Sequence, residues 1–119
     1  MMLYKLLLIF LGGGLGSLIR FGISNQPYLF SNKFPLATFL ANIVSSLILG
    51  FSFKYYQINE SQHWIRFFIM IGFCGGLSTF STFTAENFNL IQQSQYSIFV
   101  AYTLLSVSIC LFFFWLGLR

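Results

Sequence analysis

The feature that most constrains this chain is a succession of four long apolar stretches within 119 residues. Hydrophobic residues make up 57% of the sequence and charged residues only 7%, whereas a soluble domain carries roughly 25% charged residues. About 20 apolar residues in a helix cross the hydrocarbon core of a bilayer. The sequence therefore predicts an all-α integral membrane protein, a single four-helix domain over residues 1–119. We expect spans at about 3–23, 35–53, 67–91 and 96–118.

The connections between these stretches are short and polar. The first stretch follows Lys5 and lacks an A-x-A cleavage site, so we interpret it as a retained span and not as a signal peptide. Pro27 lies in the first connection, and Lys54 to Arg66 is expected to form an interfacial loop with tyrosine and tryptophan. Four spans place both termini on one side of the membrane.

The charged residues are few and scattered singly. On the side of the termini we expect Lys5, Lys54, Arg66 and Arg119, and on the other side Arg20 and Lys33. This division is a weak bias that leaves the orientation open under the positive-inside rule. No cluster or stripe of basic residues suits nucleic acid.

The sequence gives no indication of an enzyme. Cys74 and Cys110 lie inside apolar runs without metal-ligand spacing, and His63 lies in a polar segment beside Trp64. Paired carboxylates, a nucleophile with its base and a phosphate loop are all missing from the sequence. We therefore expect a non-catalytic membrane protein.

The third stretch contains the most informative segment, GFCGGLSTFSTF from Gly72 to Phe83. Adjacent glycines disfavour helix by roughly 1 kcal/mol each, so the chain is expected to unwind at Gly75 and Gly76. Unwound backbone inside a membrane is tolerated only against protein or a water-filled cavity, and its freed carbonyls suit a cation such as Na⁺. The alternative is a small-residue packing face made by Gly72 and Gly76.

Two phenylalanines follow this segment on one helical face. Phe80 and Phe83 are three residues apart, and the edge of an aromatic ring carries positive potential. Ring edges can accept an anion that has lost part of its water, with the hydroxyls of Ser81 and Thr82 as further donors. The alternative is that both rings face lipid or pack against other helices.

Two other spans carry polar side chains at helical spacing. Thr38, Asn42 and Ser46 form one stripe, and Tyr102, Ser106 and Cys110 form another. Polar groups inside a membrane hold helices together or line a pathway, and the Asn42 amide is the strongest candidate donor to an anion. Charged side chains at helix centres are costly, so Glu86 and Arg20 either function within the membrane or extend to its surface.

Taken together, these residues resemble the CrcB/Fluc family of fluoride channels over nearly the whole chain. GGGLGSLIR from Gly12 to Arg20 resembles the signature of the family's first helix. FPLATFLAN from Phe34 to Asn42 resembles F-P-x-G-T-x-x-x-N. The segment from Gly72 to Phe83 resembles G-x-x-G-G-x-T-T-F-S-T-F, the most specific of the three motifs.

The resemblance implies a fluoride-selective channel that exports cytoplasmic fluoride passively across the bacterial inner membrane. It implies an antiparallel, dual-topology dimer with two pores, formed with a second copy or with a paired homologous subunit. It also implies one structural Na⁺ at the dimer centre, bound by the backbone carbonyls of Gly75 and Ser78. The implied fluoride pathway comprises Phe80, Phe83, Asn42, Ser81, Thr82, Thr38, Glu86, Tyr102, Ser106, Cys110 and Arg20.

Three positions depart from the family pattern. Ser78 replaces a threonine, Ala37 replaces a glycine, and Cys110 stands where a serine is usual. A thiol is a weak donor, so the polar pathway is expected to be less hydrated at Cys110. Two other classes stay open: a proton-coupled exporter similar to the small multidrug resistance family, and an assembly subunit without transport. The exporter needs a membrane-embedded acid, for which Glu86 is the only candidate.

Overall fold

The computed structural model describes residues 1–27 and 34–119, and the predicted position of Lys33 lies outside these ranges. All regular secondary structure in these two ranges is helical. Its elements are α1 (Met2–Ser24), α2 (Leu36–Ile58), the π-helical segment η2 (Ile65–Phe73), α3 (Cys74–Leu77), α4 (Phe80–Gln92) and α5 (Tyr96–Leu118). Four helical stretches are long and apolar enough to cross a membrane, the third being the composite of η2, α3 and α4. This confirms the predicted all-α class.

The connection between the second and third spans is shorter than expected. The predicted interfacial loop began at Lys54, but α2 continues as helix to Ile58. The segment after Phe53 carries two tyrosines and no helix breaker, so it can extend the helix with polar side chains outside the apolar region. The next span begins at Ile65, and the loop is confined to the residues between them.

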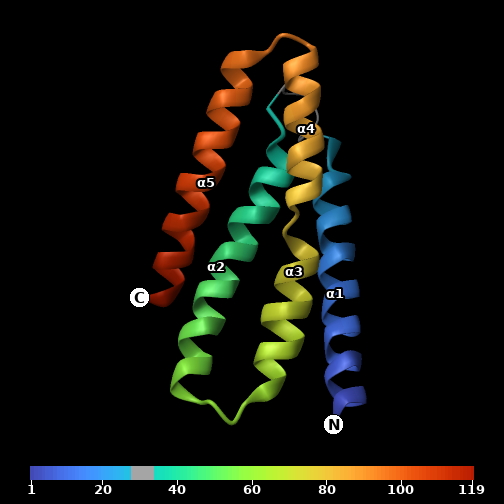
Figure 1. The fold of residues 1–119 in the computed structure, drawn as a ribbon, viewed down its shortest axis with the longest axis vertical. Coiled ribbons are helices and arrows are strands. Elements are labelled where there is room, and N and C mark those ends of the chain that lie inside the picture. The colour runs from blue at the N-terminus through green and yellow to red at the C-terminus, as the bar shows by residue number, and fades with distance from the viewer. Residues whose placement is uncertain (28–33) are drawn as a thin grey trace.

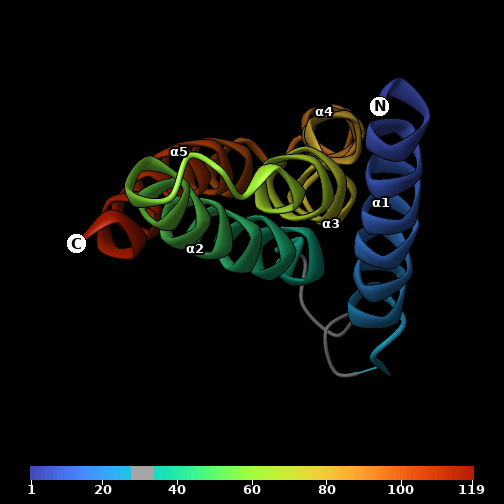
Figure 2. The ribbon, with the colours of Figure 1, turned by 90° about the horizontal axis from the view of Figure 1, so that it is seen from below.

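The helices associate as two pairs. The most extensive contact is between α2 and α5, and the next is between α1 and η2, with α3 continuing the second pair. Figure 2 shows α1 on the outer side of α3 and α4, away from α5. Both termini lie toward the end of the molecule that holds the turn between α2 and η2 (Figure 1), as the count of four spans predicted.

Glycines allow the close approach of α1 to the third span. A Cβ atom at Gly12 or Gly16 would overlap with the carbonyl oxygen of Phe68 or Phe73. From the other side, Gly72 and Gly76 face the backbone of α1 in the same way. Small residues let helix backbones meet in membranes, where packing and not the hydrophobic effect holds helices together. The packing interpretation of Gly72 and Gly76 is therefore confirmed.

A second glycine contact joins α2 to α5. A Cβ atom at Gly50 would overlap with the Phe114 carbonyl, and one at Gly117 would meet the backbone of α2 near Leu47. The rings of Phe53 and Phe114 lie 6.2 Å apart beside this contact. The pair formed by α2 and α5 is thus held by backbone proximity at one end, which leaves the polar stripes of both helices to face each other further along.

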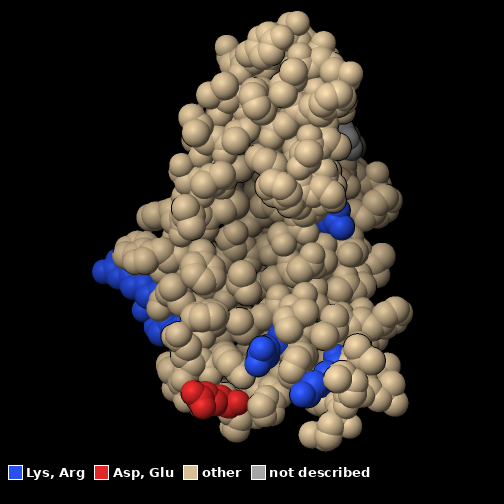
Figure 3. Space-filling view, viewed as in Figure 1, with Lys and Arg blue, Asp and Glu red and all other residues tan. Residues whose placement is uncertain are grey.

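Most of the basic side chains lie toward the end that carries the termini. Figure 3 shows one face of the molecule, on which the visible Lys and Arg side chains lie at mid-height and below, with one acidic patch near the lower end. The Lys54 ammonium donates to the Arg119 carbonyl at 2.7 Å, and Lys5 and Arg66 each lie over the Phe67 ring. This basic, aromatic end suits the headgroup region of a bilayer.

Candidate ion site at the break in the third span

The third span leaves the helical conformation at Ser78 and Thr79. Both residues are extended, with φ and ψ of −79° and 157° at Ser78 and −153° and 123° at Thr79. The prediction that the chain unwinds at Gly75 and Gly76 was wrong, because both glycines belong to the helical turn α3. Packing against α1 keeps Gly76 helical. The break falls about one turn later, where side-chain oxygens and not helical carbonyls accept from the backbone N–H groups of Thr79 and Thr82.

The break is held by hydrogen bonds from α2. Asn42 accepts from the Thr79 N–H at 2.8 Å through Oδ1 and donates to the Thr79 carbonyl at 3.3 Å through Nδ2. The Ser45 hydroxyl donates to the Cys74 carbonyl at 2.9 Å, and the Ser78 hydroxyl donates to the same carbonyl at 2.7 Å. The bonds from Asn42 satisfy the Thr79 backbone groups, which would otherwise be costly inside a membrane.

Helix α4 restarts with a side-chain cap. Thr79 is its N-cap residue, and its hydroxyl accepts from the Thr82 N–H at 3.2 Å. Threonine is a favoured N-cap because its oxygen satisfies an N–H that lacks a helical partner. This signal was present in the sequence, but Thr79 was not among the predicted site residues.

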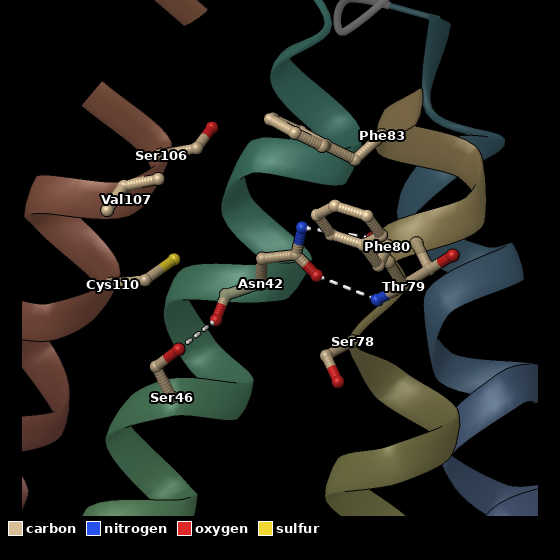
Figure 4. A pocket seen from close by; sticks show the side chains of 9 residues that line it. All are labelled: Asn42, Ser46, Ser78, Thr79, Phe80, Phe83, Ser106, Val107 and Cys110. Carbon is tan, nitrogen blue, oxygen red and sulfur yellow. Dashed lines mark hydrogen bonds between the residues drawn. The ribbon is translucent and has the colours of Figure 1, made fainter. Parts of the chain in front are cut away.

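A cavity of about 260 Å³ lies beside the break, between α2, α4 and α5. Figure 4 shows its lining, with Asn42 and Ser46 from α2 facing Phe80 and Phe83 from α4, and Ser106 and Cys110 from α5. The cavity is lined mostly by apolar surface with a few polar atoms, which is typical of a selective site for a small ligand. The remaining lining residues are Ser78, Thr79 and Val107.

The two predicted rings lie together at this cavity. The centroids of Phe80 and Phe83 are 5.6 Å apart with an interplanar angle of 33°. Phe83 also packs on Tyr102, at 4.9 Å between centroids, whereas 79% of the Phe80 surface is exposed. Phe83 is thus fixed by its neighbours, and Phe80 borders the open side of the cavity.

Arg20 reaches into the membrane-spanning region instead of extending to the surface. Its Nε donates to the Gly76 carbonyl at 3.0 Å. It lines a second cavity of about 310 Å³ with Thr38, Thr79 and Thr82. The guanidinium and the threonine hydroxyls give this recess a positive charge and hydrogen-bonding groups among mostly apolar surface.

Glu86 lies one helical turn beyond Phe83. Its Oε1 is 3.5 Å from the hydroxyl of Tyr102, which is fully buried. The Ser106 hydroxyl is also buried, and it has no hydrogen-bond partner among residues 1–27 and 34–119. A buried donor without a protein partner is costly unless water or a ligand satisfies it.

The structure divides the predicted site residues into groups. Phe80, Phe83, Asn42, Ser106 and Cys110 share the first cavity. Arg20, Thr38 and Thr82 share the second. Glu86 and Tyr102 lie beside Phe83, and Ser81 is exposed with its hydroxyl 3.3 Å from that of Thr79.

The backbone at the break fits a cation. In an unbroken helix the Gly75 and Ser78 carbonyls would accept from the N–H groups of Thr79 and Thr82. Those N–H groups donate to Asn42 and to the Thr79 hydroxyl instead. The two carbonyls therefore lack their helical donors. In the described part of the chain no group of three His, Cys, Asp or Glu side chains could hold a metal, so an ion here would depend on these carbonyls.

Comparison with known proteins places this arrangement in a family. The family model described as "CrcB-like protein, Camphor Resistance (CrcB)" matches residues 7–118. The chain belongs to the CrcB family. All three motifs identified in the sequence lie inside the matched range, as do both cavities.

Curated relatives of this CrcB-family chain carry the name "Fluoride-specific ion channel FluC". One from Coxiella burnetii is 44% identical over 117 residues, covering 95% of this chain and 94% of the relative. One from Flavobacterium psychrophilum is 41% identical over 113 residues, covering 92% and 90%. A third, from Pyrococcus abyssi, is 45% identical over 92 residues, covering 76% and 73%.

Proposed function

We propose that this multi-pass membrane protein is a fluoride-selective ion channel. The observation that carries the proposal is the cavity at the break, where Phe80 and Phe83 meet Asn42, Ser106 and Cys110. Relatives that cover nearly the whole chain are named as fluoride-specific ion channels. Both observations favour a channel over a drug exporter or an assembly subunit, and neither calls for an enzyme.

Fluoride is small and strongly hydrated, so a selective path must replace its water with short-range donors. The cavity offers the hydroxyl of Ser106, the thiol of Cys110 and the amide of Asn42. Ring edges of the two phenylalanines add positive potential without a fixed charge. A larger halide holds its water less tightly but cannot approach these donors as closely. We propose that fluoride passes this site down its gradient and leaves the cell.

The proposed conducting unit is an antiparallel dimer with two pores. Phe80 is largely exposed in the single chain, and the position of a Cβ atom at Gly75 has nothing within 4 Å. Polar backbone facing lipid is not tolerated at membrane depth, so a partner is needed on this face. A second copy related by a two-fold axis would cover its own surface, and a paired homologous subunit could do the same.

We propose that Na⁺ occupies the centre of this dimer. The Gly75 and Ser78 carbonyls of each subunit would hold it, because their helical donors are used elsewhere. Unwound carbonyls in broken membrane helices are suitable Na⁺ ligands. The ion would supply fixed positive charge between the two subunits, while Arg20 would attract anions to the adjoining recess.

Efflux from liposomes tests the proposal. Purified protein in vesicles loaded with fluoride should release it when a potassium ionophore removes the counter-potential, and a fluoride electrode would record the release. Vesicles loaded with chloride provide the selectivity control. Fluoride release no faster than from protein-free vesicles, or chloride release at the same rate, would contradict the proposal.

A further inference from the structure

The Asn42 side chain hydrogen-bonds to both backbone polar groups of Thr79, and it uses both ends of its amide. The Oδ1 atom accepts from the Thr79 N–H at 2.8 Å, and Nδ2 donates to the Thr79 carbonyl at 3.3 Å. Asn42 and Thr79 are 37 residues apart in the sequence. Asn42 therefore acts on Thr79 as a paired strand would, and it holds that residue extended.

The bond to the Thr79 N–H has a consequence one turn earlier. In an unbroken helix that N–H would donate to the Gly75 carbonyl. Here it donates to Asn42 Oδ1 instead, so the Gly75 carbonyl lacks this donor. Without Asn42 the cheapest partner for the N–H inside the membrane is the Gly75 carbonyl, because an unpaired group costs several kcal/mol in lipid. The helix would then continue past Gly75 and the carbonyl would no longer be free.

The same amide borders the anion cavity. Asn42 lines the cavity with Phe80 and Ser106, and Figure 4 shows its side chain between Thr79 and the α5 residues. A primary amide has two N–H donors, of which one is directed to the Thr79 carbonyl. One side chain thus contacts both the break that frees the carbonyls and the cavity that holds the rings.

We infer that Asn42 is a positioning residue for the cation site, which it creates by withdrawing the Thr79 N–H from Gly75. This role is separate from donating to an anion. The inference rests on the proposed function for the identity of the cation. It predicts that removing the Asn42 acceptor weakens Na⁺ binding even though Asn42 does not touch the ion.

The test measures how assembly depends on Na⁺, with no transport step. Subunits carrying donor and acceptor dyes are mixed in detergent, and dimer formation is followed by energy transfer as Na⁺ replaces N-methylglucamine. Asn42→Ala removes both hydrogen bonds, whereas Asn42→Asp keeps an oxygen that can accept from the Thr79 N–H. Asn59→Ala is the matched control, because Asn59 is at the end of α2, far from the break, and its side-chain amide donates to the Tyr55 carbonyl.

We expect Asn42→Ala to raise the Na⁺ midpoint by about ten-fold or more, as the loss of one or two hydrogen bonds implies. Asn59→Ala should stay within about three-fold of the unmodified protein, which is less than one hydrogen bond. Asn42→Asp loses only the bond to the Thr79 carbonyl, so it should shift the midpoint clearly less than Asn42→Ala does. If Asn42→Ala does not assemble at any Na⁺ concentration, Asn42→Ser replaces it with the same expected shift, because its hydroxyl is too short to reach both Thr79 groups.

The possible outcomes separate the inference from the proposed function. An unmodified protein whose assembly ignores Na⁺ would remove the proposed sodium site and the inference with it. A Na⁺-dependent protein in which Asn42→Ala and Asn59→Ala have the same midpoint would overturn the inference alone. Equal loss in Asn42→Ala and Asn42→Asp would also overturn it, because the retained acceptor would then have no effect.

Discussion

At the scale of single residues, two buried serines differ in whether their hydroxyl has a hydrogen-bond partner in the protein. Ser45 donates to the Cys74 carbonyl at 2.9 Å and lines neither of the two cavities at the break. Ser106 lines the first cavity, and its oxygen has no partner in the part of the chain that the structure describes. The two side chains have the same chemistry and similar burial but differ in their hydrogen bonding. Their substitution by alanine should therefore give different results.

Ser45→Ala should lower the free energy of unfolding by about 1 kcal/mol, the net value of a buried hydrogen bond, and leave fluoride flux per folded protein unchanged. Ser106→Ala should leave stability unchanged, because no protein hydrogen bond is lost, and should slow flux by about two- to ten-fold. Thermal unfolding in detergent and liposome efflux measure the two quantities. A Ser106→Ala protein that is destabilised but conducts normally would assign Ser106 to packing.

At the scale of helices, the sequence predicted the elements better than their junctions. Hydropathy alone determines the four spans, because each must cross the same apolar layer. The position of the break could not be predicted, since it depends on which glycines pack against α1 and on a hydrogen bond from Asn42 to Thr79. The Phe80 and Phe83 pair was predictable because residues three apart share a helical face.

Glycine packing gives a prediction for α1. A Cβ atom at Gly16 would overlap with the Phe73 carbonyl, whereas one at Gly14 has nothing within 4 Å. Gly16→Ala should therefore destabilise the protein by about 1–3 kcal/mol, as overpacking does. Gly14→Ala should be neutral or stabilise it by up to about 1 kcal/mol, because alanine favours helix. Circular dichroism during thermal unfolding compares the two, and equal melting temperatures would contradict the packing of α1 on the third span.

At the scale of the whole molecule, the single chain leaves the site at the break open on one side. Its first cavity opens beside the exposed ring of Phe80, and the break leaves carbonyls without helical donors. Both features lie at mid-span, where lipid cannot satisfy them. In the proposed dimer the second copy would close the cavity and share the cation, so conduction would belong to the pair and not to one subunit.

The central claim is that fluoride crosses the membrane along the rings at the break. The most direct test is fluoride efflux from liposomes containing Phe80→Ile or Phe83→Ile, compared with Phe88→Ile. Phe88 is on the same helix, is exposed, and lines neither of the two cavities at the break. We predict that both ring substitutions slow efflux by about ten-fold or more, equivalent to about 1.4 kcal/mol, while Phe88→Ile conducts as the unmodified protein does. Equal efflux from all three variants would contradict the claim.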